Sequence, residues 1–162
     1  MKTLYLIRHA KSDWSQNVSD FERPLNERGH RDAPKMAEFL FNKGISIDQM
    51  ISSPAKRAFT TCQYFASQFE NTKIITEPDL YMPDISDFIR TINSIQDSEN
   101  SVALFAHNEG ITYFANSLTD ENIVNIPTCG IVGFSADCET WKDFMKTPKK
   151  FLFFYYPKME GV

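Results

Sequence analysis

The sequence lacks any apolar stretch long enough to cross a membrane or to direct secretion. A membrane-spanning helix needs about 20 consecutive apolar residues, and the core of a secretory signal needs about 7 to 15. The apolar run nearest the N-terminus covers only residues 4–7. We therefore expect a soluble, cytoplasmic protein with no membrane partner. Repeats, low-complexity tracts and Gly/Ser-rich linkers are also missing, so the 162 residues are expected to form one domain, residues 1–162.

Cysteine and excess basic charge are scarce as well. The three cysteines, Cys62, Cys129 and Cys138, form no C-x-x-C pair and are odd in number, which predicts reduced, structural thiols. The net charge of −4 argues against a general nucleic-acid-binding surface. Three histidines without an H-x-x-x-H pattern or clustered ligands predict no metal site, and no P-loop motif is present. We expect neither a metal ion nor a cofactor.

Apolar residues make up 42% of the chain, enough to fill a core, and they alternate between strand and helix patterns. Residues 3–7 and 102–106 lack polar alternation, which is typical of strands buried on both faces of a parallel sheet. Further strands are expected at 47–51, 73–76, 131–135 and 151–156. This alternation predicts an α/β fold, a three-layer α/β/α sandwich with a mostly parallel central sheet.

The expected helices begin at recognisable signals. Ser53 followed by Pro54 predicts an N-cap and a first helical residue. Pro83-Asp84 opens another helix. An earlier helix, which ends near Gly44, either kinks at Pro34 or begins near Asp32.

Two arginines and two histidines fall where this fold places ligands, outside the carboxyl ends of the strands. Arg8 and His9 end the first strand, His107 ends the strand at 102–106, and Arg57 follows the Ser53 helix start. Each residue alone is more simply read as a surface arginine or a rim histidine, as His30 is on its solvated helix face. Because four of them meet at one edge, we interpret them as an anion site.

The chemistry of these side chains fits a phosphoryl group. Arginine stays charged and matches phosphate oxygens with a planar fork. A neutral imidazole can attack phosphorus if its other nitrogen donates to a backbone carbonyl. The residue set therefore indicates phosphoryl transfer.

The motifs around these residues resemble the histidine phosphatase superfamily, whose fold is called phosphoglycerate-mutase-like. They are Leu6-Ile7-Arg8-His9-Ala10, the stretch from Ser52 to Ala58 that contains Arg57, and Phe105-Ala106-His107-Asn108. Ala106 replaces the glycine usual before the second histidine. Within the superfamily the sequence is similar to SixA-type phosphohistidine phosphatases, through Arg8 to Ser12 and Glu22-Arg23-Pro24-Leu25-Asn26. The likeness spans almost the whole chain.

The resemblance implies roles for individual residues. His9 is expected to be the nucleophile that is transiently phosphorylated, while Arg8, Arg57 and His107 bind the phosphoryl oxygens, with His107 protonated in the complex. Ser15 stands where a mutase has an asparagine and is expected to offer its hydroxyl. Arg23 is expected to be a further substrate ligand.

One expected element of the broader family is missing. Mutases and broad phosphatases carry a general acid in a Leu-x-Glu context, and the local match here is Leu80-Tyr81-Met82. General acid catalysis contributes roughly 10²–10⁴-fold, and an alkoxide needs that proton more than a phosphoramidate does. The absence favours phosphohistidine as substrate, with Asp84 and Glu109 left open as substitute acids.

The leading hypothesis is a metal-independent phosphohistidine phosphatase that acts on a phosphoprotein, such as a phosphorelay or phosphotransfer domain. Two alternatives stay open: a phosphatase of small phosphate esters, and a non-catalytic phosphate-binding module. The sequence identifies neither the partner protein nor the oligomeric state.

Overall fold

The computed structural model describes residues 1–71 and 73–162, and its strands form a single twisted sheet. The order across the sheet is β3-β2-β4-β1-β5-β6. The strands are β1 (Lys2–Arg8), β2 (Gln49–Ser52), β3 (Ile74–Thr76), β4 (Ser101–Ala106), β5 (Ile131–Ala136) and β6 (Lys149–Tyr155). Strands β3, β2, β4 and β1 are parallel, whereas β5 and β6 run antiparallel to their neighbours. The predicted mostly parallel sheet is confirmed.

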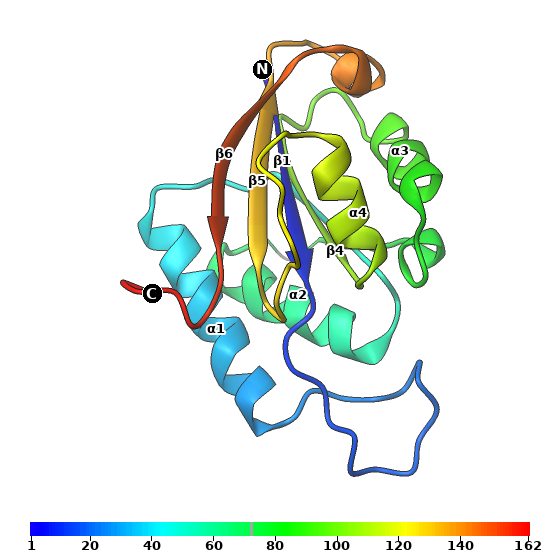
Figure 1. Ribbon diagram of the computed structural model, residues 1–162, viewed down its shortest axis with the longest axis vertical. Coiled ribbons are helices and arrows are strands. Elements are labelled where there is room, and N and C mark those ends of the chain that lie inside the picture. The colour runs from blue at the N-terminus through cyan, green and yellow to red at the C-terminus, as the bar shows by residue number, and fades with distance from the viewer. Residues whose placement is uncertain (72) are drawn as a thin grey trace.

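Helices cover both faces of this sheet (Figure 1). They are α1 (Glu27–Asn42), α2 (Lys56–Gln68), α3 (Ile85–Asn93) and α4 (Gly110–Ser117), with the 3-10 helices η1 (Pro78–Leu80) and η2 (Trp141–Lys146). The helices α1 and α2 belong to one apolar cluster, while α3, α4 and η2 belong to another. The expected α/β/α layering is therefore present, with an apolar core on each side of the sheet.

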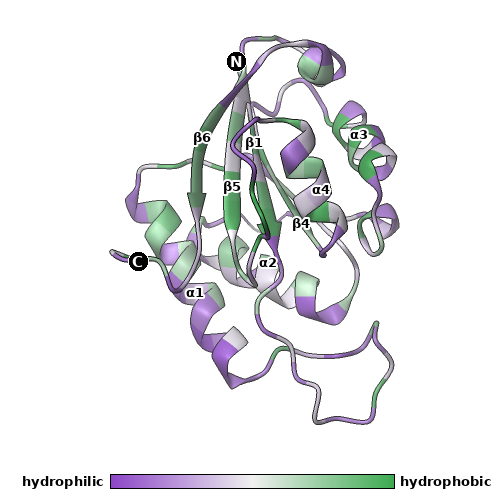
Figure 2. Ribbon diagram, viewed as in Figure 1, coloured by the Kyte–Doolittle hydropathy of each residue, from purple (hydrophilic) through white to green (hydrophobic). Residues whose placement is uncertain are grey.

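Strand β1 shows why its sequence has no polar alternation. Leu4 and Leu6 pack into the core beneath α3 and α4, and Tyr5 and Ile7 pack into the core beneath α1 and α2. All four side chains are buried, and Figure 2 shows the strands as the most hydrophobic elements. Burial on both faces fixes the strand firmly, so its carboxyl end is a rigid support for the residues that follow.

Two helix starts differ from the expectation. Helix α1 begins at Glu27 rather than near Asp32, because the Asn26 side chain accepts a hydrogen bond from the Gly29 N–H at 2.9 Å and caps the earlier turn. Pro34 lies inside this helix. Helix α2 begins at Lys56 without a side-chain cap, so Ser53 is not its N-cap.

The third helix start is as expected, since Asp84 caps α3 and accepts from the Asp87 N–H at 2.9 Å.

Within residues 1–71 and 73–162, no helix combines the length and apolar character that crossing a membrane requires.

Candidate active site

The two histidines leave the sheet side by side because their strands are parallel neighbours. Arg8 of β1 pairs with Ala106 of β4, so the next residues, His9 and His107, emerge at the same edge. Their ring centroids lie 5.0 Å apart. Both side chains are buried.

A pocket of about 490 Å³ opens at this edge. Most of the side chains around it are polar or charged. They are Arg8, His9, Lys11, Ser12, Trp14, Asp20, Arg23, Arg57, Tyr81, Met82, Pro83, His107, Asn108, Glu109 and Thr128, with Gly110 completing the wall. The structure thus brings Arg8, His9, Arg57, His107 and the loop residue Arg23 to one pocket.

His9 is held in one tautomer by the backbone. Its Nδ1 lies 2.7 Å from the carbonyl oxygen of Ala10, and because a carbonyl only accepts, Nδ1 must carry the proton. Burial lowers the pKa of His9 well below its ordinary value, and the nearby His107 lowers it further. The ring is therefore neutral near pH 7, with an unshared electron pair on Nε2.

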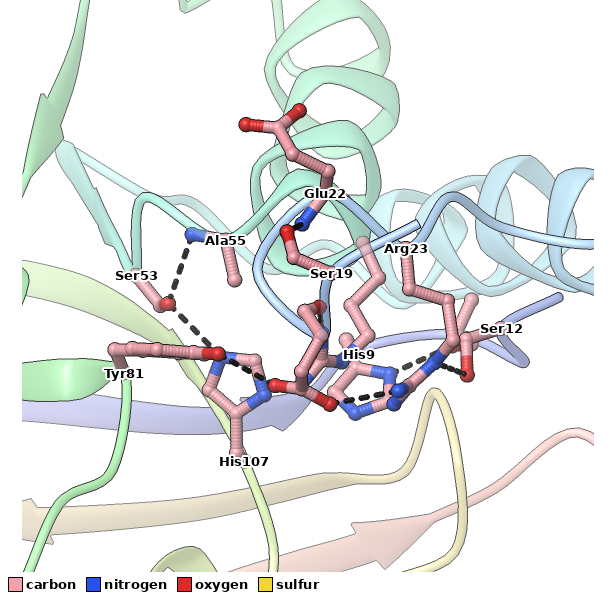
Figure 3. Close-up of polar contacts among 12 residues, drawn as sticks. His9, Ser12, Ser19, Glu22, Arg23, Ser53, Ala55, Tyr81 and His107 are labelled. Carbon is pink, nitrogen blue, oxygen red and sulfur yellow. Dashed lines mark hydrogen bonds and ion pairs between the residues drawn. The ribbon is translucent and has the colours of Figure 1, made fainter. Parts of the chain in front are cut away.

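His107 is fixed through its other nitrogen. Its Nε2 lies 2.8 Å from the hydroxyl of Ser53, a contact drawn as a dashed line in Figure 3. That hydroxyl oxygen also accepts from the Ala55 N–H at 3.2 Å. The Ser53 hydroxyl hydrogen is thus free to point at Nε2, which leaves Nδ1 of His107 as the N–H donor. Burial, followed by the Arg57 charge, lowers the pKa of His107 to about 3.

The two arginines are each anchored at one end. Arg8 donates through Nη1 to the carbonyl of Ile126 at 2.9 Å. Arg57 donates to the backbone carbonyl and the carboxylate of Asp20, at 2.5 and 3.1 Å. Burial, and then the neighbouring Arg57, lower the pKa of Arg8. The fold thus places two positive charges close together in a buried site, an arrangement that an anion would stabilise.

Three buried donors have no partner within the protein. They are Nε of Arg8, Nε of Arg57 and Nδ1 of His107, and they are all the unpartnered buried side-chain nitrogens and oxygens in the described part of the chain. All three belong to side chains that line the pocket. Buried polar groups are rarely left unpaired. A ligand with several acceptor oxygens and negative charge, such as a phosphoryl group, satisfies them.

Asp20 is a residue that the sequence did not single out. Its carboxylate accepts from the hydroxyl of Tyr81 at 2.5 Å, from Arg23 at 2.6 Å and from Arg57 at 3.1 Å. The Tyr81 hydrogen bond, then those of Arg23 and Arg57, hold the pKa of this carboxyl far below its usual range. Tyr81 lies 61 positions from Asp20 in the sequence, so no local sequence pattern predicts the contact between them.

In the loop before α1, the serine at the pocket is Ser12 and not the expected Ser15. Arg23 donates through Nε to Ser12 at 3.0 Å and lies 3.7 Å over the ring of Trp14. Ser12 lines the pocket, whereas Ser15 is exposed and donates its hydroxyl to Asp13 at 2.6 Å. Ser15 is thus not brought to the site. With Nε and Nη1 occupied, Arg23 retains Nη2 for a ligand.

Of the two residues considered as substitute acids, Glu109 and Asp84, only Glu109 is at the pocket. Glu109 is among the residues that line the pocket, and its carboxylate accepts from the hydroxyl of Tyr113, a residue outside that lining, at 3.0 Å. Asp84 lies outside it, at the N-terminus of α3. Met82 lines the mouth and is 81% exposed, so the Leu80-Tyr81-Met82 stretch brings a thioether, not a carboxyl, to this wall.

Comparison with known proteins agrees with this geometry. The sequence profile described as histidine phosphatase superfamily (branch 1) matches residues 4–81, which include Arg8, His9 and Arg57. This part of the chain is therefore similar to the histidine phosphatase superfamily. A further relative is the 2,3-bisphosphoglycerate-dependent phosphoglycerate mutase of Thermoplasma acidophilum, 42% identical over 84 residues, which cover 49% of this chain and 40% of the mutase.

Solved structures with a similar fold match nearly the whole chain. SixA of Agrobacterium tumefaciens, a proposed phosphohistidine phosphatase, has a TM-score of 0.83 at 24% identity, with 96% of this chain and 98% of that one covered. The protein histidine phosphatase SixA complexed with tungstate has a TM-score of 0.81 at 19% identity, with 96% and 97% covered. The fold is therefore the phosphoglycerate-mutase-like one.

Proposed function

We propose that this protein is a phosphatase that hydrolyses phosphohistidine on a phosphoprotein, through a covalent phosphoryl group on His9. The match to the histidine phosphatase superfamily profile supports phosphatase activity in general. The observation that carries the finer proposal is the hydrogen bond from Nδ1 of His9 to the Ala10 carbonyl, 2.7 Å long. It keeps Nε2 free as a nucleophile in a pocket that also contains three unpartnered donors.

The mechanism follows from these positions. Arg8, Arg57 and His107 bind the phosphoryl oxygens, and their charge and N–H groups stabilise the transition state, where most catalysis of phosphoryl transfer arises. The dianion raises the pKa of His107 in the complex, because opposite charge favours the protonated ring. The Nε2 pair of His9 forms the new P–N bond as the leaving group departs, and water then hydrolyses phospho-His9. The arginines supply the positive charge, so the proposed reaction needs no metal ion.

The wall of the pocket favours a phosphoramidate over a phosphate ester. An alkoxide needs a proton as it leaves, and a general acid contributes roughly 10²–10⁴-fold. Met82 cannot donate one, and Asp84 lies outside the pocket. A phosphorylated imidazole carries its own proton on the second ring nitrogen, so it can leave without an acid from the enzyme.

The mouth of the pocket favours a protein substrate. Trp14 and Met82 line it and are 73% and 81% exposed. Exposed apolar side chains beside a site commonly contact a partner surface. A structurally similar SixA is described as a protein histidine phosphatase. We therefore propose a phosphorelay or phosphotransfer domain as the class of partner.

The test is phosphate release from a phosphohistidine-bearing phosphotransfer domain, with His9→Ala and His30→Ala compared. His30 is exposed and contacts Tyr64, outside the pocket, so it is the matched control. We expect His9→Ala to lose all turnover and His30→Ala to keep it. Normal turnover by His9→Ala would overturn the mechanism.

A second candidate function is a phosphatase of small phosphate esters, because the acidic residue Glu109 is among those that line the pocket. Comparing kcat/KM for a phosphohistidine peptide with that for sugar and acyl phosphates separates the two. A large preference for esters would favour this second function. Failure to trap phospho-His9 with a labile aryl phosphate would instead indicate a non-catalytic phosphate-binding module.

A further inference from the structure

The carboxylate of Asp20 has acceptor capacity that the protein does not use. An ionised carboxylate offers about four acceptor positions, and three are taken by Tyr81, Arg23 and Arg57. Of its two oxygens, Oδ2 accepts from Tyr81 and Arg57, whereas Oδ1 accepts from Arg23 alone. The side chain is 53% exposed and lines the pocket. A substrate N–H can therefore reach it.

The depth of the surrounding residues places Asp20 on the leaving-group side. His9, Arg57 and His107 are 6%, 5% and 4% exposed and form the floor. In phosphoryl transfer the nucleophile and leaving group lie roughly in line through phosphorus. If His9 attacks from the floor, the leaving group departs toward the mouth, where Asp20 and Met82 are exposed. Tyr81, which orients Asp20, packs edge-on against His107 with centroids 5.6 Å apart (Figure 3).

We propose that Asp20 selects a phosphorylated imidazole by accepting a hydrogen bond from the N–H of its second ring nitrogen. This inference rests on the proposed phosphohistidine phosphatase activity and assigns its leaving-group specificity to one carboxylate. The same contact gives no advantage to a sugar phosphate, whose leaving oxygen needs a donor and not an acceptor.

The charges around Asp20 keep it an acceptor. It faces Tyr81 from the segment after η1, Arg23 from its own loop, Arg57 from α2 and His107 from the end of β4. The Tyr81 hydroxyl and the two arginines hold the pKa of its carboxyl far below its usual range. Burial, and then Asp20 itself, raise the pKa of Tyr81, so its hydroxyl remains a donor. Asp20 is therefore ionised at neutral pH.

The step balances as written. The substrate reacts as the imidazolium, with phosphorus on one ring nitrogen and a proton, hydrogen-bonded to Asp20, on the other. Nε2 of His9 forms a P–N bond, while the electron pair of the breaking P–N bond returns to the substrate ring. The ring leaves as neutral imidazole and keeps its proton, and the positive charge passes to phospho-His9. By stabilising the imidazolium, Asp20 raises the pKa of the bound substrate ring.

The experiment measures kcat/KM for N-phosphorylimidazole and for p-nitrophenyl phosphate, whose leaving group needs no proton. Asp20→Asn keeps the shape and removes the charge. We expect it to lower kcat/KM for N-phosphorylimidazole about 10- to 100-fold more than for the aryl phosphate, as expected for one hydrogen bond to a charged group. We also expect kcat for N-phosphorylimidazole to decline at lower pH than in the wild type, with no such shift for the aryl phosphate.

Glu22→Gln is the matched control, because Glu22 is an exposed carboxylate of the same loop that is not among the residues lining the pocket, and its ratio between the two substrates should equal that of the wild type. Glu109→Gln is measured as the competing assignment. An equal loss for both substrates in Asp20→Asn would mean that Asp20 only positions Arg57, and it would overturn the inference. A selective loss in Glu109→Gln would transfer the role to Glu109. A wild type that turns over the aryl phosphate but not N-phosphorylimidazole would instead refute the proposed function, and with it the role of Asp20.

Discussion

The imidazole rings of His9 and His107 are tilted by 51° with their centroids 5.0 Å apart, and each has one nitrogen fixed by an oxygen of the protein. The Ala10 carbonyl fixes one ring at Nδ1, and the Ser53 hydroxyl fixes the other at Nε2. The two rings therefore present opposite kinds of nitrogen to a ligand. His9 offers a lone pair that can attack, and His107 offers an N–H that can bind an oxygen.

Replacing His107 tests this division of labour. His107→Ala removes a buried donor to the phosphoryl oxygens, and loss of one such donor costs about 10²–10³ in kcat. We expect phospho-His9 to form more slowly, by the same factor, in rapid-quench measurements. His30→Ala is the control, since His30 is exposed. An unchanged rate in His107→Ala would contradict the assigned donor role.

Acid should destabilise the protein through the same histidine. The pKa of His107 is lowered to about 3 in the folded state from an ordinary value of 6.5. Between these values the unfolded chain binds more protons, so the free energy of unfolding decreases as the pH falls. From pH 6.5 to 5 this amounts to about 2 kcal/mol, at 1.36 kcal/mol per pH unit.

Urea unfolding at pH 6.5 and at pH 5, with wild type and His107→Asn compared, measures this effect. The variant should lose less stability on acidification by about the same 2 kcal/mol. His9 has a lowered pKa too, so part of the pH dependence remains in the variant. An identical decrease in both proteins would show that His107 takes up no proton on unfolding.

Arg57 should determine anion affinity through its shape as well as its charge. Arg57→Lys keeps a positive charge but loses the planar fork that reaches both Asp20 and a ligand. We expect tungstate to bind about 10- to 100-fold more weakly by calorimetry, the loss expected for a hydrogen bond to a charged group. Arg28→Lys is the control, because Arg28 pairs with Asp32 on α1. Equal affinities in both variants would argue that charge alone binds the anion.

Gly110 is required by a close backbone approach. A Cβ at this position would lie 2.0 Å from the carbonyl oxygen of Pro83, so Gly110→Ala must displace one wall of the pocket. We expect a loss of about 1–3 kcal/mol in unfolding free energy, together with lower activity. Gly44→Ala, with open space but a φ of +78°, should cost only about 1–2 kcal/mol from strain and leave activity unchanged. Activity lost equally in both variants would refute the role of the Pro83 contact.

The strand ends were predictable from the sequence because of their burial pattern. Residues 4–7 and 102–106 are uniformly apolar, and these runs end at Arg8 and at His107. Two parallel strands buried on both faces end at the same edge of the sheet. The proximity of Arg8 and His107 at that edge therefore follows from the topology. The pairing of Arg8 with Ala106 agrees with that expectation.

The loop contacts were not predictable, since they depend on how the chain from Asp13 to Pro24 folds back. Asp20 reaches Tyr81 and Arg57, and Ser12 rather than Ser15 reaches Arg23. None of these pairs has a periodic pattern. Ser53 was misread for a related reason: Ser-Pro is a good local helix start, but the tertiary contact with His107 takes the hydroxyl.

The stacking of Arg23 on Trp14 gives the protein a natural optical reporter. The chain has two tryptophans. Trp141 is fully buried and donates its indole N–H to the Glu99 carbonyl at 2.7 Å, whereas Trp14 is 73% exposed at the pocket mouth, under a guanidinium that also contacts Asp20. The longer-wavelength emission of exposed Trp14 should change in intensity when a ligand enters, whereas the shorter-wavelength emission of buried Trp141 should shift to the red on unfolding. One unlabelled sample therefore reports both events by fluorescence.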